Sequence, residues 1–145
     1  MKKLIFPALV AIVLLSSFVK NTNTNILNDD LKKFYVHLGK NIKYPSIASA
    51  ANLQGNTQVL FSVNDGKLDG IKIEKALGSN CDIEVVNQLL AFDDYKSLKN
   101  GKYALKVTFK LEGAKSGLKN STIESPTDYT PMELVIVGYA PNKGK

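Results

Sequence analysis

Residues 102–111 read K-Y-A-L-K-V-T-F-K-L, and this stretch decides the fold. Apolar side chains alternate there with lysine, alanine and threonine; they are Tyr103, Leu105, Val107, Phe109 and Leu111. A period of two indicates a half-buried strand of an antiparallel sheet. Lysines on the outer face discourage pairing with other chains, so we expect this strand near or at an edge of its sheet. An ordinary amphipathic strand with solvated lysines is the alternative that the pattern leaves open.

Two helices are predicted before this strand. Apolar residues recur at helical spacing over residues 31–42, and the helix must end before Tyr44-Pro45 because proline disfavours helical geometry in the residue before it. A short helical turn can follow over residues 46–52. Residues 82–92 again show helical spacing, with acidic side chains in the first turn that complement the positive end of a helix.

A β-hairpin is predicted between these helices. Residues 56–63 alternate in polarity, Asn64-Asp65-Gly66 supplies a turn, and residues 68–77 form the return strand. Gly70 marks either a bulge or a weakened position in that strand. The order of elements fits an α+β domain: a small antiparallel sheet of the hairpin and the third strand, with helices packed on one face. A fourth strand from the tail stays open.

Composition limits the classes of function. The chain has 145 residues, of which 44% are hydrophobic, and this suits one domain with appendages. All 19 basic residues are lysines, so the net charge of +6 arises without the guanidinium fork that recognises phosphate and guanine. We therefore expect no nucleic-acid partner.

Residues 1–20 have the pattern of an export signal. Lys2 and Lys3 precede an uncharged, apolar run that ends at Val19. The run is shorter than the roughly 20 residues usual for a membrane span, and no Ala-x-Ala site stands nearby. A cleaved signal peptide and a retained N-terminal membrane anchor therefore both stay open. Residues 21–30 read as a polar tether.

The residues that could carry enzyme chemistry are few. His37 is the only histidine and Cys81 the only cysteine, and they fall in separate predicted elements. His37 lies between the apolar positions of its helix and is expected to face solvent, while Cys81 is expected to be a small buried thiol. No nucleophile–base set, metal-ligand cluster or glycine-rich phosphate loop is apparent, so we expect no enzyme and no cofactor or metal.

Several short motifs, in this order and spacing, resemble the C-terminal domain of TonB in its short Bacteroidetes versions, over residues 31–112. The matching motifs are Tyr44-Pro45 with Ala48, Gly55 opening the alternating strand, Asn64-Asp65-Gly66-Lys67, Cys81-Asp82, and Asn100-Gly101-Lys102. The resemblance implies a periplasmic protein-interaction module. Its last strand would bind extended segments of outer-membrane TonB-dependent receptors by β-augmentation, in energy-coupled transport or its modulation. Inner-membrane motor proteins are further partners that it implies.

The resemblance also implies the residues of the docking site. The expected edge strand comprises Lys102, Tyr103, Ala104, Leu105, Lys106, Val107, Thr108, Phe109 and Lys110. Expected neighbouring contacts come from the segment around the Tyr-Pro pair: Asn41, Lys43, Tyr44 and Pro45.

The C-terminal part reads as a flexible linker, residues 113–131, and a strand-forming tail, residues 132–145. The tail segment resembles the Val-Val-Val-Gly-Tyr-Gly stretch near the N-terminus of many Bacteroidetes receptors, at Leu134, Val135, Ile136, Val137, Gly138 and Tyr139. We expect it to pair with the docking edge of its own or a neighbouring copy, and a fourth core strand is the alternative. A secreted or anchored structural domain that self-assembles by exchanging this strand is the second hypothesis for function.

Overall fold

The computed structural model describes residues 29–141, so the expectations for the N-terminal segment lie outside the described residues. The elements in chain order are α1 (Asp29–Asn41), α2 (Ser46–Ala50), β1 (Gly55–Asn64), β2 (Lys67–Lys75), α3 (Cys81–Ala91), the 3-10 turn η1 (Tyr95–Ser97), β3 (Gly101–Glu112) and β4 (Thr130–Tyr139). Among these residues no helix has the length and apolarity needed to cross a membrane.

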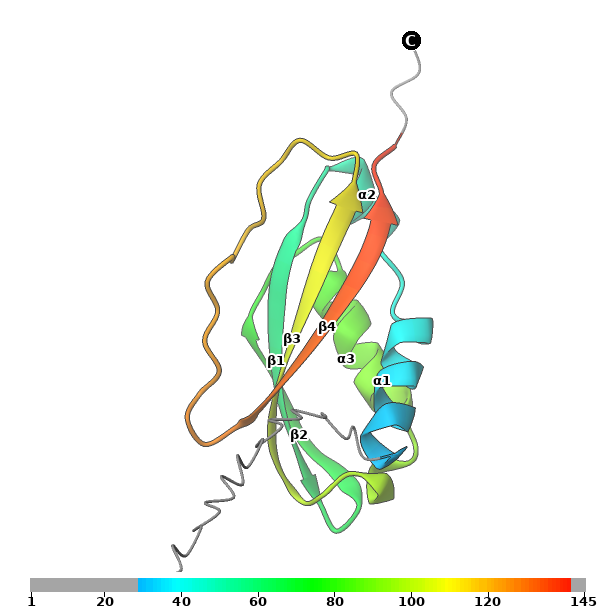
Figure 1. Ribbon diagram of the computed structural model, residues 1–145, viewed down its shortest axis with the longest axis vertical. Coiled ribbons are helices and arrows are strands. Elements are labelled where there is room, and N and C mark those ends of the chain that lie inside the picture. Colours follow the sequence, from blue (N-terminus) through cyan, green and yellow to red (C-terminus); the bar gives the residue numbers. More distant parts are fainter. Residues whose placement is uncertain (1–28, 142–145) are drawn as a thin grey trace, which may run out of the picture.

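The predicted α+β class is confirmed, with four strands in the order β2-β1-β3-β4 (Figure 1). The hairpin of β1 and β2 turns at Asp65 and Gly66, which both have positive φ, 49° and 69°. Gly70 is the bulge: Phe61 pairs with Ile71 and Ser62 with Asp69, so Gly70 is the extra residue. Its φ of 72° explains why glycine stands there.

Residues 102–111 lie near an edge of the sheet, as expected, but the expectation that they form the edge strand itself is wrong. β3 pairs with β1 on one side, antiparallel, and with β4 on the other, parallel. It is therefore an inner strand of the sheet. Its lysines reflect the solvent face of the sheet rather than an edge. A cationic outer face is compatible with either position, because the side chains project above the sheet while the pairing partners lie within it.

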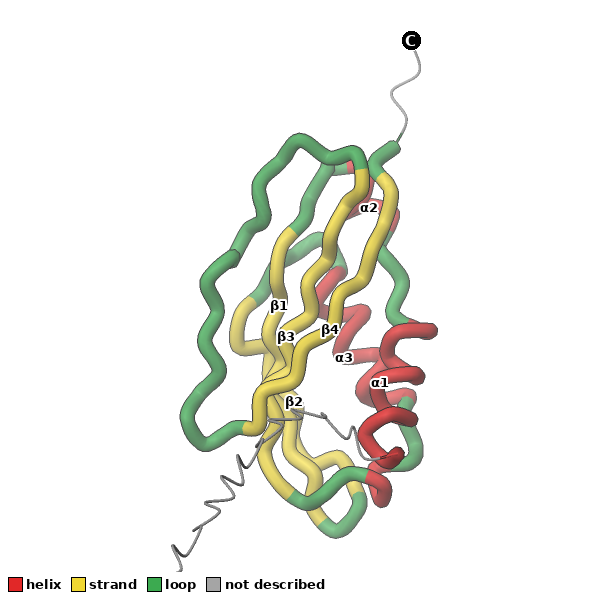
Figure 2. The backbone as a smooth tube through the Cα atoms, in the orientation of Figure 1, coloured by secondary structure: helices red, strands yellow, loops and turns green. Residues whose placement is uncertain are grey.

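The tail forms β4, the fourth strand of the same sheet. It pairs with β3 of its own chain. β4 runs parallel to β3 from Thr130 opposite Tyr103 to Tyr139 opposite Glu112, which makes the sheet mixed. Parallel neighbours need a long crossover connection. Residues 113–129 provide it by running back along the sheet, beyond β1 (Figures 1 and 2).

One face of the sheet carries the helices and the core. α1 and α3 pack against each other and against this face, as Figure 1 shows. The largest fully buried side chains come from α1, α3, β1 and β3; they include Phe34, Leu89, Phe61 and Phe109. The β1 residues that face the opposite way are buried too, with Asn56 and Gln58 at 5% and 2% exposure, because the crossover covers them.

Candidate docking site beside strand β3

The outer edge of β3 forms the candidate site, which we call the strand slot: the position beside β3, bounded by Tyr44 and Ser49, that β4 fills. Ala140 donates its N–H to the Glu112 carbonyl (3.0 Å). Backbone groups alternate in direction along a strand, so the even-numbered residues of β3 and of β4 direct theirs into the shared ladder. The slot therefore accepts an extended segment in parallel orientation over the ten paired residues of the register.

The predicted edge residues divide between two faces. Tyr103, Leu105, Val107 and Phe109 are buried in the core, as their alternation predicts. The other members point away from the helices, and among them Ala104 is fully buried. Each lysine on this face has a partner: Lys102 lies over the Tyr129 ring (5.6 Å), Lys106 pairs with Glu133 (2.5 Å) and Lys110 with Glu112 (3.5 Å).

The strand that fills the slot alternates in the same way. Met132 and Ile136 are buried at 2% and 7% exposure, and Leu134 packs against the core between them. Val135, Val137 and Tyr139 face away from the core and are 58%, 49% and 78% exposed. β4 is thus a core strand on one face and an apolar, solvent-exposed strand on the other.

The C-terminal end of the slot is built by the segment around the Tyr-Pro pair. The Tyr44 ring packs edge-on against Phe109, with 5.4 Å between ring centroids, and its hydroxyl donates to the Leu53 carbonyl (2.5 Å). The Ser49 hydroxyl donates to the Tyr139 carbonyl (2.9 Å). Burial raises the pKa of Tyr44 to about 12, with the nearby Cys81 as a smaller cause, so the hydroxyl remains a donor at neutral pH.

Of the neighbouring residues Asn41, Lys43, Tyr44 and Pro45, the structure places Tyr44 against β4, at Gly138. Pro45 is the N-cap residue of α2. Lys43 is exposed; its N–H donates to Glu84 on α3 (3.0 Å) and its ammonium to the Lys40 carbonyl (3.0 Å). The Asn41 amide donates to the His37 carbonyl within α1 (2.7 Å).

The outer edge of β4 is the present edge of the sheet. Since even-numbered residues of β4 face β3, the backbone groups of Val135 and Val137 point outward. Within residues 29–141 those groups have no hydrogen-bond partner, whereas Tyr139 has Ser49. An exposed apolar edge of this kind is a place where another extended chain can add.

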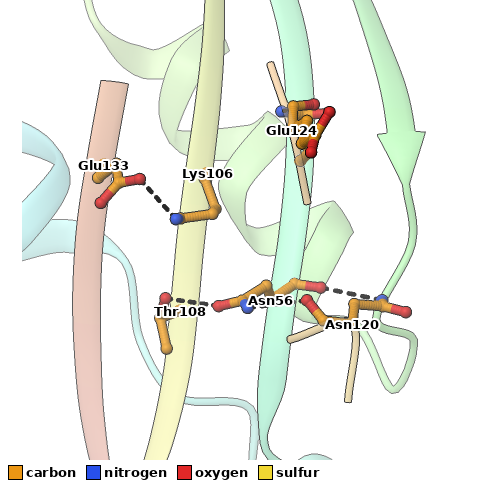
Figure 3. A network of polar contacts seen from close by, with 7 residues as sticks. Asn56, Lys106, Thr108, Asn120, Glu124 and Glu133 are labelled. Carbon is orange, nitrogen blue, oxygen red and sulfur yellow. Dashed lines mark hydrogen bonds and ion pairs between the residues drawn. The ribbon is translucent and has the colours of Figure 1, made fainter. Parts of the chain in front are cut away.

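A network of amides fastens the crossover to β1 (Figure 3). Asn120 donates from its side chain to the carbonyls of Asn56 (3.0 Å) and Ala76 (2.9 Å), and the Asn56 amide donates back to the Asn120 carbonyl (2.9 Å). Thr108 of β3 donates to the Asn56 side chain (2.5 Å). Lys119 adds a parallel bridge to Gly55. This network sets the path by which the tail returns to the start of β3.

The two residues considered for chemistry are in structural roles. His37 is half-buried rather than solvent-facing: its Nε2 donates to the Gln88 carbonyl of α3 (3.0 Å) and its ring lies 5.2 Å from that of Phe92. Cys81 is buried as expected, and burial, followed by the Asp82 carboxylate, raises the pKa of its thiol to about 12. In the part of the chain that the structure describes, no three His, Cys, Asp or Glu residues gather as a metal site.

Some residues of the site were missed at the sequence level. Ser49 and the pair Asn56 and Asn120 make contacts between segments far apart in the chain, and no local pattern signals them. The strand-forming pattern of the tail includes Met132 but does not by itself indicate that this side chain is buried. Of these residues, only Asn120 is of a type that could indicate its role, because asparagine tolerates the left-handed φ of 52° found here better than most residues.

No family model, no curated protein and no solved structure matches the chain. The geometry of the strand slot is therefore the basis of the proposed function.

Proposed function

We propose that this chain is a periplasmic, TonB-like interaction module that binds extended segments of outer-membrane receptors in its strand slot, in energy-coupled transport or its modulation. The observation that carries the proposal is the parallel pairing of β3 with a strand from a distant part of the chain. Backbone pairing of this kind gives affinity to any extended segment, and inward side chains give selectivity. The resemblance to TonB supplies the class of partner.

A receptor segment must compete with the tail. A strand tethered to its own domain has an effective concentration on the order of millimolar. A free segment that makes the same contacts is therefore at a disadvantage, since its apparent affinity falls with the fraction of open slots. The tail thus sets a threshold that a receptor segment overcomes by better contacts or by being held nearby.

A titration of the isotope-labelled full chain tests the proposal. The titrant is a synthetic peptide that carries Val-Val-Val-Gly-Tyr-Gly, and a scrambled peptide is the control. We expect amide resonances of β3 and β4 to change together as the peptide replaces the tail. Changes confined to β2, or none at millimolar peptide, would contradict the proposal.

A second candidate is a secreted or anchored structural domain that self-assembles by exchanging β4 between copies. The exposed Val135, Val137 and Tyr139 and the long crossover favour it, because exchange keeps every native contact and needs only a connection that can reach. Sedimentation of the chain alone separates the two. Dimers that form as concentration rises favour exchange, and a monomer at all concentrations favours receptor binding.

A further inference from the structure

We propose that Tyr44 makes the strand slot selective for glycine. The segment that fills the slot, the tail or a receptor segment, must carry glycine where Gly138 lies and apolar residues two, four and six positions before it. This inference rests on the proposed function for its class of ligand. Its physics rests on contacts between described residues.

Gly138 is a glycine for steric reasons alone. It is buried, it faces the helices and it lies opposite Leu111 in the register. A Cβ atom there would stand 2.6 Å from Cγ and Cδ2 of Tyr44 and 3.1 Å from its Cβ, which is closer than real Cβ contacts allow. The φ of Gly138 is not positive, so its backbone conformation would accept other residues.

Tyr44 has no free direction in which to yield. Its hydroxyl is bonded to the Leu53 carbonyl (2.5 Å) and its ring lies against Phe109, which is itself fully buried. Pro45 restricts the backbone of the residue before it. Moving the ring would break a hydrogen bond and open the core, so the clash falls on the incoming strand.

The glycine also fixes the register of the bound strand. Ser49 bonds the carbonyl of Tyr139, and Ala140 donates to Glu112, directly after Gly138. A slip of two residues keeps the same face inward but places the Ile136 side chain against Tyr44. The ligand is therefore an extended segment in which alternating apolar residues lead up to a glycine, and it binds in one register only.

A double-mutant cycle in the full chain tests the contact. We expect Gly138→Ala to lower the folding equilibrium constant about ten- to hundredfold, as overpacking does. In a Tyr44→Ala background the same change should cost less than about threefold, because the added methyl group then has room. Gly39→Ala on α1 is the control, since nothing lies within 4 Å of its added Cβ, and it should cost nothing. An equal loss in both backgrounds would overturn the inference.

Two peptides extend the test to binding and remain informative if a variant fails to fold. One peptide is residues 131–141, P-M-E-L-V-I-V-G-Y-A-P, and the other replaces its glycine with alanine. With the natural full chain we expect the glycine peptide to bind about ten- to hundredfold more tightly. Equal affinities would overturn glycine selectivity. Binding of neither peptide, with the coupling in the cycle intact, would contradict the proposed function while the selectivity of the slot for its own tail stands.

Discussion

Cys81 shows how burial decides the chemistry of a residue. It is fully buried at the start of α3, and the pKa of its thiol is about 12 because of burial and, second, the Asp82 carboxylate. The reactive thiolate is therefore scarce at neutral pH. We predict that a thiol reagent leaves the native chain unmodified at pH 8 and labels one thiol per chain in denaturant. Rapid labelling of the native chain would contradict this burial.

Alkaline pH should destabilise the fold through the same buried groups. Burial raises the pKa of Tyr44 from 10.0 to about 12 and that of Tyr95 further, and it raises that of Cys81 from 9.0 to about 12. Between about pH 9 and 12 the folded chain holds protons that the unfolded chain releases, so the free energy of unfolding falls as pH rises. Below pH 9 these groups contribute fully. Denaturant unfolding at pH 8, 10 and 11.5 measures this, and a flat profile would contradict it.

Asn120 combines a left-handed backbone with two donated hydrogen bonds. Asn120→Gly keeps the conformation and loses the bonds, so we expect a loss of about 1–2 kcal/mol in the free energy of unfolding. Asn120→Ala adds the cost of a left-handed conformation, about 1 kcal/mol more. Chemical unfolding of both variants gives the values. Two neutral variants would mean that the crossover is not fastened here.

At the scale of elements, the two faces of β4 differ in burial: one packs into the core and the other faces solvent. Ile136→Ala removes a buried side chain and should cost about 2–4 kcal/mol in the free energy of unfolding. Val137→Ala, the matched control one residue along, changes an exposed side chain and should stay within about 0.5 kcal/mol. Chemical unfolding compares them. Similar losses for the two variants would contradict the alternation on which the slot is built.

The sequence could predict the features of the fold that depend on local geometry. The hairpin turn, the bulge at Gly70 and the helix before Tyr44 depend on local geometry, and each is where its pattern indicated. The partner of β3 does not depend on local geometry. Whether β3 is an edge depends on where the tail returns, and long-range contacts from Asn56 to Asn120 set that path.

At the scale of the whole molecule, the tail is both a core strand and the competitor of a ligand. Deleting it would remove Met132 and Ile136 from the core, so a deletion confuses loss of folding with an open slot. A disulfide between β3 and β4 would hold the tail in place without removing it. Lys110 and Val137 are suitable positions for its two cysteines, because they are register partners on the solvent face.

The chain carrying Lys110→Cys and Val137→Cys tests the central claim, that a receptor segment takes the place of β4. Neighbouring strands hold such pairs at distances that a disulfide spans, and Cys81 stays buried and protonated. Binding of the Val-Val-Val-Gly-Tyr-Gly peptide is measured with the pair oxidised and again after reduction, with Lys110→Cys alone as the control. We predict that the oxidised chain does not bind and that reduction restores binding. Equal binding in both states would show that the segment adds outside β4, and the account would be wrong.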